Sequence, residues 1–575
     1  MDKDSAHGST TYRFIVLTLM GCGLGTVVSL SALLFVECVS WLNTALLVAP
    51  RARVQILDDR LLAFLTVLVP TLGGALVGSL IYRLSAERRV LGPADVIFSA
   101  QLRKPMPDAR SGLVSTIASV LSLGCGASVG QYGPLVYLGA LQASLLDRLK
   151  LRIPNARSIA IACGVAAAIS TAFNAPIAGL VFAHEVILRH YSLQAFAPTT
   201  VASASGFIVA NVLFERPPLF LVTFAGVGQV YEFALFALLG IACACLAVVF
   251  MKCVLGSARI ANASRLHPAL RPAVAGLVVG MVALELPDVL GIGTELLRFA
   301  TIEGAFDNLE LASLVIAKLL LTALCLGFGF AGGIFSPSLL VGILFGALCW
   351  NMLGVVGVEN SGIAVYAISS MMALASAIIG APLTAILIVF ELTRNYELTI
   401  AAMVSVVFAN LVVFRWAGRS LFDIQLAARG VNLSAGRDRA QMQQLYLSSL
   451  PLSKAVMVDP GDAATTAYRR MLDARRAEAV VVKASGQFVG LLRLQDLAGD
   501  AKGTVSEKLQ TDSLVLYNDS SLWDAMNGMQ GFIGETIPVL SRDGQRFLGV
   551  LSEGDIISAY MQTVHRARRE ENDAL

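Results

Sequence analysis

The stretch Gly130-Gln131-Tyr132-Gly133-Pro134 lies inside a run from Ser111 to Leu146 that contains no Asp, Glu, Lys or Arg. A second stretch, Gly332-Gly333-Ile334-Phe335-Ser336-Pro337, lies inside a similar run from Leu319 to Val358. Glycines and a proline interrupt what could otherwise be continuous membrane helices. Proline suits the first helical position, because its missing N–H would be unpaired there anyway. Each stretch therefore predicts a broken helix that restarts at its proline.

A helix that restarts inside a membrane exposes unpaired N–H groups and the positive end of its dipole. Exposed backbone at bilayer depth is tolerated only where it is buried in protein or lines a wet cavity. Two such N-termini that meet at the midplane would form a site for a small anion. The alternative is a pair of glycine-rich helix kinks without a ligand. The predicted pathway residues are Gly130, Gln131, Tyr132, Gly133, Pro134, Gly333, Ile334, Phe335, Ser336 and Pro337.

The composition indicates a polytopic membrane protein. Of 575 residues, 56% are hydrophobic and 14% are charged, whereas soluble proteins carry about 25% charged residues. The mean hydropathy is +0.72, and the net charge of +3 is too small to suggest a nucleic-acid partner. The nine cysteines show no CxxC or Cys/His metal spacing, which predicts neither a metal site nor a disulfide framework. The sequence shows no nucleophile–base pair, so it gives no indication of an enzyme.

An internal repeat divides the apolar region into two halves. Asn174–Glu185 resembles Gly380–Glu391, because in both segments Ala-Pro is followed by an apolar helix that ends in glutamate at the same spacing. The two Gly/Pro stretches precede these segments in the same order. Two halves with paired broken helices point to a transport site between repeats. The pattern by itself does not tell whether the repeat is inverted.

The composition changes after Phe414. Residues 451–562 contain two copies of a pattern of strand, glycine turn, strand and helix start. We therefore expect a soluble α/β region behind an all-α membrane domain. The expected divisions are a tail at 1–13, a membrane domain at 14–430 with halves at 14–255 and 268–430, a linker at 431–450, soluble units at 451–500 and 501–563, and a charged tail at 564–575.

These residues together resemble the CLC family of chloride channels and chloride/proton antiporters. The matching motifs are Gly-Ile-Phe-Ser-Pro at 333–337, Ala-Phe-Asn-Ala-Pro at 172–176 and Ala-Pro-Leu-Thr-Ala-Ile at 381–386. The resemblance implies an inverted two-half fold, a homodimer in the lipid bilayer and one anion pathway in each subunit. The soluble region resembles the paired CBS domains that many family members carry.

The sequence departs from the family at the positions that contact the anion. The family reads Gly-Lys/Arg-Glu-Gly-Pro, but its gating glutamate is replaced here by Tyr132, with Gln131 before it. Its Gly-Ser-Gly-Ile-Pro aligns with residues 90–94, so that Leu91 replaces the serine and Gly92 remains. The anion-coordinating tyrosine corresponds to Phe422. The inner proton-accepting glutamate of the antiporters corresponds to Val186, next to Glu185.

Tyr132 is the predicted gate. Its phenol has a reference pKa of about 10, so it cannot carry protons as a carboxylate does, but it can donate a hydrogen bond or plug a pore. The alternative is an aromatic side chain packed on a neighbouring helix. His184 and Glu185 are the candidate proton site, since histidine titrates near neutral pH. The alternative for Glu185, and for Glu391, is a structural role at a helix end.

In the soluble region, Ser552 and Asp555 fit the Ser/Thr-x-x-Asp pattern with which CBS domains hold a nucleotide ribose. The resemblance implies an adenine nucleotide as a ligand, and no cofactor is required. The alternative is that both are polar turn residues. Arg415 and Arg419 follow the last span, which places the soluble region in the cytoplasm, and the short soluble regions suggest a bacterial inner membrane.

Three functions fit these observations. The first is passive conduction of a small anion, chloride by resemblance, because the helix-start cradle is kept and the carboxylates are lost. The second is chloride/proton antiport through a non-standard proton relay. The third is a non-conducting, membrane-anchored nucleotide sensor.

Overall fold

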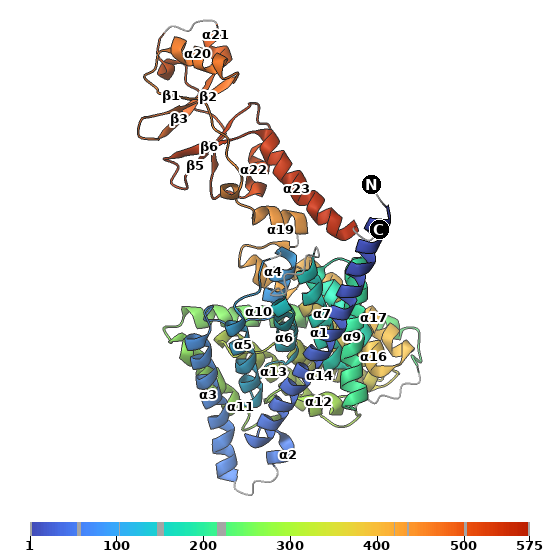
Figure 1. Ribbon diagram of the computed structural model, residues 1–575. Coiled ribbons are helices and arrows are strands. Elements are labelled where there is room, and N and C mark those ends of the chain that lie inside the picture. Colours follow the sequence, from blue (N-terminus) through green and yellow to red (C-terminus); the bar gives the residue numbers. More distant parts are fainter. Residues whose placement is uncertain are drawn as a thin grey trace. The chain divides into compact units, whose positions relative to one another are not determined.

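The computed structural model describes residues 3–53, 59–102, 104–146, 155–215, 226–418, 420–433, 436–498 and 503–572. The chain divides into two compact units, Met1–Ala428 and Arg429–Asp573 (Figure 1). Within the described residues of the first unit, eight helices are long and apolar enough to cross a bilayer. The predicted all-α membrane domain with a following α/β region is therefore confirmed.

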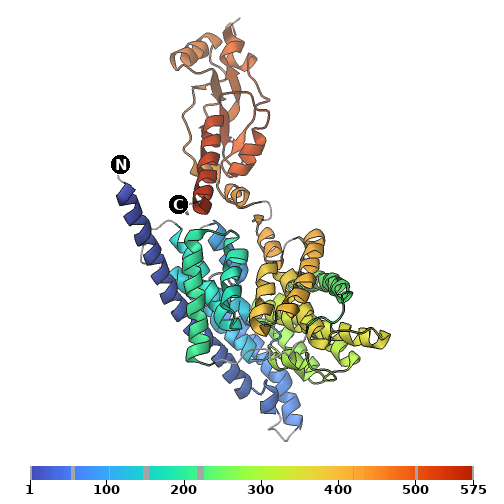
Figure 2. The same ribbon diagram turned by 90° about the vertical axis from the view of Figure 1, so that its right-hand side faces the viewer.

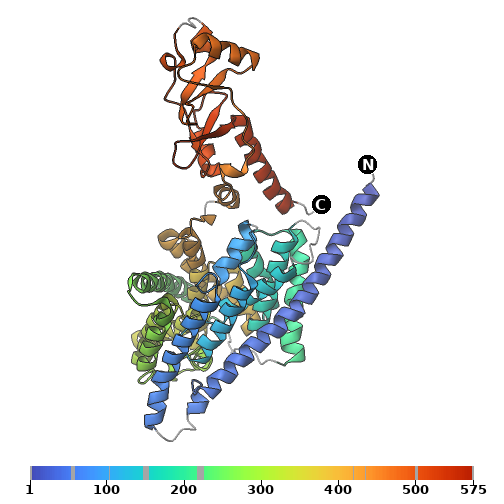
Figure 3. The ribbon, with the colours of Figure 1, turned by 60° about the vertical axis from the view of Figure 1, so that its left-hand side comes forward.

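The first half of the membrane unit runs to residue 215. Its elements are α1 (Lys3–Ala45), α2 (Pro50–Arg53), α3 (Asp59–Leu84), α4 (Pro93–Leu102), α5 (Ala109–Gly124), α6 (Tyr132–Leu145), α7 (Ala156–Phe173), α8 (Pro176–Phe182), the π-helical η2 (Ala183–Leu188), α9 (Leu193–Phe207) and the π-helical η3 (Ile208–Leu213). Helix α1 begins within the expected N-terminal tail and lies along the outside of the bundle beside α7 and α9 (Figure 3).

The second half begins with α10. Its elements are α10 (Glu232–Ala263), η4 (Pro268–Leu270), α11 (Arg271–Val282), η5 (Pro287–Val289), α12 (Thr294–Phe299), α13 (Asn308–Phe328), α14 (Phe335–Val356), α15 (Ile363–Ile379), α16 (Pro382–Thr393), α17 (Tyr396–Ala417) and α18 (Leu421–Ala427). We expected the first half to extend to residue 255, but α10 packs against α13, α15 and α17. The halves therefore divide before Glu232, and they lie side by side (Figure 2).

The broken helices restart slightly earlier than predicted. Helix α6 begins at Tyr132 and α14 at Phe335, which places Pro134 and Pro337 at the third position of their helices rather than the first. The reason is that the first four N–H groups of a helix all lack an internal partner, so proline costs no hydrogen bond anywhere in the first turn. Helices α8 and α16 do begin at the prolines of their Ala-Pro pairs, as expected.

Helix α6 is held close to α7 by two glycines. A Cβ atom on Gly139 would collide with the carbonyl oxygen of Gly164, and a Cβ on Gly164 would collide with that of Gly139. Small residues let membrane helices approach closely and gain packing energy. This contact brings Phe173, at the end of α7, near the start of α6.

The second unit contains two similar halves. The first has the sheet β1 (Met457–Val458), β2 (Glu478–Val482) and β3 (Phe488–Arg493) with α20 (Ala464–Asp473), α21 (Leu494–Ala498) and η8 (Val505–Glu507). The second has β4 (Leu516–Tyr517), β5 (Ile537–Leu540) and β6 (Phe547–Leu551) with α22 (Leu522–Gly528) and α23 (Glu553–Asn572), and α19 (Arg437–Gln443) and η7 (Leu447–Ser449) precede both.

The register of the two sheets is equivalent. In each sheet a parallel pair is followed by an antiparallel pair: Val480 faces Met457 and Leu491, and Val539 faces Leu516 and Gly549. In the second unit, the core around β4–β6 includes Met442 and Leu447, which we expected in the linker. These apolar side chains are buried because the short second sheet needs a cover that α19 and η7 supply.

Candidate anion pathway

The two Gly/Pro stretches pair with each other through backbone hydrogen bonds. The N–H of Gly130 donates to the carbonyl oxygen of Gly333 at 2.7 Å, and the N–H of Gly333 donates to that of Gly130 at 2.7 Å. The N–H of Gln131 donates to Oγ of Ser336 at 3.2 Å. The bridge is antiparallel, which fits an inverted repeat. The N-termini of α6 and α14 therefore start from one shared junction.

Only glycine fits at this junction. A Cβ on Gly130 would lie 2.8 Å from the carbonyl oxygen of Gly333, and one on Gly333 would lie 2.8 Å from the backbone nitrogen of Gly133. We expect Gly333→Ala to separate the stretches, break both hydrogen bonds and lower the free energy of unfolding by about 2–4 kcal/mol, as overpacking and lost buried hydrogen bonds do. Thermal unfolding in detergent measures the loss. Gly354→Ala, at a helical glycine with open space around it, is the control and should leave the melting temperature unchanged.

Three aromatic rings gather where the two helices start. The ring of Tyr132 stacks on that of Phe173, with centroids 3.9 Å apart and an interplanar angle of 18°. The ring of Phe335 lies edge-on to both, and its centroid is 5.4 Å from the centroid of each of the other two rings. All three side chains are buried. Sequence reasoning did not single out Phe173, although it belongs to the Ala-Phe-Asn-Ala-Pro motif.

A small cavity lies beside these rings. Its volume is about 20 Å³, and its lining includes Pro93, Gly133 and Phe422 as well as Tyr132 and Phe335. Such a volume holds about one water molecule. The structure thus brings residues of both halves and of α18 together around a narrow, apolar space. Among the described residues that line this space, none carries a carboxylate.

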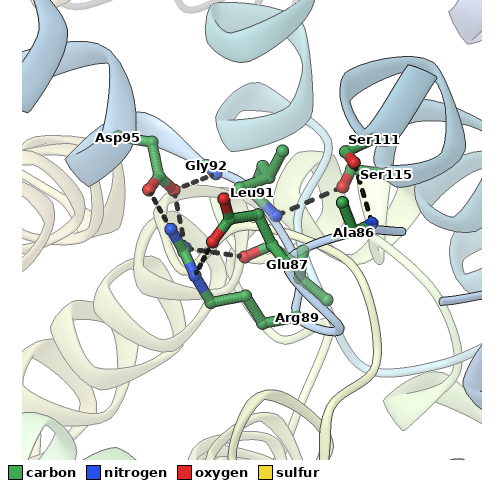
Figure 4. A network of polar contacts seen from close by, with 9 residues as sticks. Ala86, Glu87, Arg89, Leu91, Gly92, Asp95, Ser111 and Ser115 are labelled. Atoms are coloured by element: carbon green, nitrogen blue, oxygen red, sulfur yellow. Dashed lines mark hydrogen bonds and ion pairs between the residues drawn. The ribbon is translucent and has the colours of Figure 1, made fainter. Parts of the chain in front are cut away.

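The start of α4 is occupied by the protein's own side chains (Figure 4). The N–H of Gly92 donates to Oδ2 of Asp95 at 3.0 Å, and the N–H of Leu91 donates to Oγ of Ser115 at 3.3 Å. Nη2 and Nη1 of Arg89 donate to the two carboxylate oxygens of Asp95, at 2.7 and 3.1 Å. Sequence reasoning missed Asp95, although an acid in the first turn is a common signal of a helix start. The assignment of Gly92 to the pathway stays a prediction.

The paired glutamates cap each other's helices. Glu185, in η2, accepts hydrogen bonds from the N–H groups of Leu383 and Thr384 at the start of α16, at 2.9 and 2.8 Å. Glu391, in α16, accepts from the N–H groups of Ile177 and Ala178 at the start of α8, both at 2.8 Å. A carboxylate at a helix N-terminus satisfies unpaired donors and faces the positive dipole end. The geometry supports the structural role for both residues.

His184 is buried and has polar neighbours at both ring nitrogens. Nδ1 lies 3.1 Å from the carbonyl oxygen of His190, and Nε2 lies 3.1 Å from Oγ1 of Thr199. With Glu185 it lines a larger cavity of about 710 Å³. Its role as a proton site stays a prediction.

In the second unit, Ser552 and Asp555 bind each other at the start of α23. Oγ of Ser552 donates to Oδ2 of Asp555 at 2.8 Å, and the N–H of Asp555 donates to Oγ of Ser552 at 3.1 Å. This is the geometry of a helix cap, and the nucleotide site stays a prediction. Within the described ranges, no group of three or more His, Cys, Asp or Glu side chains could hold a metal ion.

Comparison with known proteins identifies the class. The family described as voltage gated chloride channel matches residues 73–413, and the CBS domain family matches residues 505–562. The chain therefore belongs to the voltage gated chloride channel family and is an integral membrane protein with a CBS region.

Its relatives include both channels and exchangers by name. It is 30% identical over 368 residues to a putative chloride channel protein ClcB-like of Ralstonia nicotianae, covering 63% of this chain and 85% of that protein. It is 28% identical over 425 residues to the H⁺/Cl⁻ exchange transporter ClcA of Yersinia pseudotuberculosis, covering 72% and 87%.

Solved structures share the fold. A slow cyanobacterial Cl⁻/H⁺ antiporter superposes with a TM-score of 0.65 at 22% identity and covers 72% of this chain and 97% of its own. A eukaryotic CLC transporter superposes with a TM-score of 0.63 at 18% identity and covers 95% and 98%. At this identity the likeness concerns the fold alone.

Proposed function

We propose that this protein conducts a small anion such as chloride passively, and that Tyr132 stands as the gate at the meeting point of α6 and α14. The observation that carries the proposal is the aromatic cluster of Tyr132, Phe173 and Phe335 at that point. A phenol at the gate position has no charge that competes with an anion. The described acids Glu185 and Glu391 are engaged in capping helices.

The chemistry of the pathway suits transient binding. The N-termini of α6 and α14 direct their dipoles toward the junction, which attracts an anion without a fixed positive charge. The rings of Phe335 and Phe422 offer no strong ligand, so the anion is held weakly and can leave. Conduction needs such a balance between entry and release.

Antiport is the second candidate, and the similarity to the Yersinia exchange transporter and to the cyanobacterial Cl⁻/H⁺ antiporter favours it. It would require a proton relay through groups other than the family's two glutamates, with His184 and Glu185 as the first candidates. The two functions differ in one measurable property, the coupling of anion flux to proton movement.

The deciding experiment uses the full chain in lipid vesicles that carry a chloride gradient and a pH-sensitive dye. We expect chloride to flow down its gradient without uphill proton movement. The Yersinia exchanger, reconstituted in parallel, is the positive control for coupling. Uphill proton movement driven by chloride through this chain would contradict passive conduction.

The flux is also expected to depend weakly on pH. Because a phenol of reference pKa about 10 stays protonated between about pH 5 and 8, the state of the gate does not change over that range. We expect the initial chloride flux to vary less than about twofold there. A steep dependence that persists in Tyr132→Phe would assign the gate to another residue.

We further propose that the protein acts as a homodimer in a bacterial inner membrane with its CBS region in the cytoplasm. Large apolar side chains are exposed on α9, α16 and α17, including Phe196, Leu383 and Leu411, and either lipid or a second subunit would cover them. Mass measurement in detergent distinguishes a dimer from a monomer.

We also propose that the CBS region binds an adenine nucleotide through Ser552 and Asp555. The carboxylate of Asp555 accepts two hydrogen bonds from Ser552, and ribose hydroxyls could replace them. A rise in melting temperature with ATP that Asp555→Asn removes would support this. Nucleotide binding without any anion flux would favour the sensor function instead.

A further inference from the structure

The C-terminal end of η2 connects the two helices that bring Pro93 and Phe422 to the cavity. Nε2 of Gln101, in α4, donates to the carbonyl oxygens of Ile187 and Leu188, both at 2.6 Å. Arg189 ends η2, and its Nη1 lies 2.7 Å from Oδ1 of Asp423 in α18. Helices α4 and α18 are therefore both fastened to one short segment.

The ion pair between Arg189 and Asp423 is largely shielded from solvent. The Arg189 side chain is 19% exposed and that of Asp423 is 8% exposed, and both line the cavity of about 710 Å³. A shielded pair is costly to break from one side, because the remaining charge stays buried without its partner. Arg189 also holds the left-handed backbone conformation, with φ of 55°, which a non-glycine residue adopts only when its surroundings demand it.

Asp423 caps the first turn of α18 with one carboxylate oxygen and faces Arg189 with the other. Oδ2 accepts from Oγ of Ser420 at 3.0 Å, the N–H of Asp423 donates back to the same Oγ at 3.1 Å, and Oδ1 faces Arg189. Phe422 lies between Ser420 and Asp423 in this turn, and it lines the small cavity beside Tyr132. The place of the Phe422 ring therefore depends on where Arg189 holds Asp423.

We propose that Arg189 and Asp423 are a positioning pair that sets the ring of Phe422 at the aromatic constriction, which is the narrow space beside the rings of Tyr132, Phe173 and Phe335. The pair acts through Phe422 and does not itself contact the anion. This inference rests on the proposed anion pathway for its effect on flux, but the geometric part concerns only α18. When the pair is broken, the first turn of α18 loosens, and the width of the constriction is no longer fixed.

The experiment uses the full chain with Arg189→Gln, Asp423→Asn and the double variant. Hydrogen exchange read by mass spectrometry reports on the amides of Leu421–Ala427. We expect exchange in this segment to accelerate at least about tenfold in each single variant, which corresponds to about 1.4 kcal/mol of local stability. The double variant should be little worse than either single one, since both remove the same contact.

Flux through vesicles supplies the second measurement. We expect the preference for chloride over the larger nitrate ion to fall at least about threefold in the single variants, because a loosened ring admits the larger ion; this is about 0.65 kcal/mol. Arg189→Lys keeps a cation that can reach Oδ1 and should restore most of the preference. Asp462→Asn, which breaks an exposed pair with Arg470 in the second unit, is the matched control and should leave both measurements unchanged.

The outcomes separate the role of the pair in holding α18 from its role in anion flux. If α18 exchange and the nitrate preference stay at wild-type values in both single variants while only the melting temperature falls, the pair is merely structural and the inference is overturned. If the wild-type chain passes no anion, the proposed function fails, and hydrogen exchange alone still decides whether the pair holds α18. Additive effects in the double variant would also contradict a shared contact.

Discussion

Replacing Tyr132 with alanine is expected to raise chloride flux at least about tenfold. The phenol ring packs against Phe173 and Phe335 and borders a cavity of about 20 Å³. Removing it enlarges this cavity at the start of α6, where the helix dipole draws an anion. A tenfold rise corresponds to a decrease of only about 1.4 kcal/mol in the activation free energy for anion passage. Chloride efflux from vesicles at a fixed protein-to-lipid ratio measures it.

Tyr132→Phe separates the ring from its hydroxyl. If the ring alone obstructs the pathway, the phenylalanine variant keeps the wild-type flux; if the hydroxyl binds the anion, anion preference changes. Tyr137→Phe is the matched control, because Tyr137 lies buried on the same helix and its hydroxyl has no hydrogen-bond partner among the described residues. An unchanged flux in a folded Tyr132→Ala protein would show that Tyr132 is not the obstruction.

Replacing Glu391 with alanine is expected to lower the free energy of unfolding by about 2 kcal/mol. The carboxylate accepts two backbone hydrogen bonds at the start of α8, and loss of a cap at a helix N-terminus costs up to about 2 kcal/mol. Glu185→Ala should cost at least as much, because Glu185 also accepts from Oγ1 of Thr384 at 2.6 Å. Thermal unfolding of purified protein in detergent compares the variants.

Glu303→Ala is the control for this comparison, since Glu303 lies exposed in a loop after α12. It should leave the melting temperature unchanged. A Glu185→Gln protein that keeps its stability but loses a proton-coupled flux would contradict the structural assignment and would return Glu185 to the role of a proton site.

Several features of this protein are determined by local sequence. The long uncharged runs and their Gly/Pro interruptions predict broken membrane helices, because hydrophobicity and proline act on the segment that carries them. The equal spacing from Ala-Pro to glutamate predicts that α8 with η2 repeats as α16. This spacing, too, is a property of each local segment. Alternation of apolar residues and glycine turns likewise predicts the two small sheets of the second unit.

Other features depend on side chains that the sequence keeps far apart. Nothing near Glu185 indicates that it caps α16, whose start lies about two hundred residues later, and nothing near Arg189 indicates Asp423. The stacking of Phe173 on Tyr132 depends on the close contact of α6 with α7. These partners are chosen when packed helices enclose polar groups away from water, because each buried donor or charge must then find a partner within the protein. Local sequence thus determined the broken helices and the aromatic residue at the gate position, and only the tertiary structure decided which groups hold them in place.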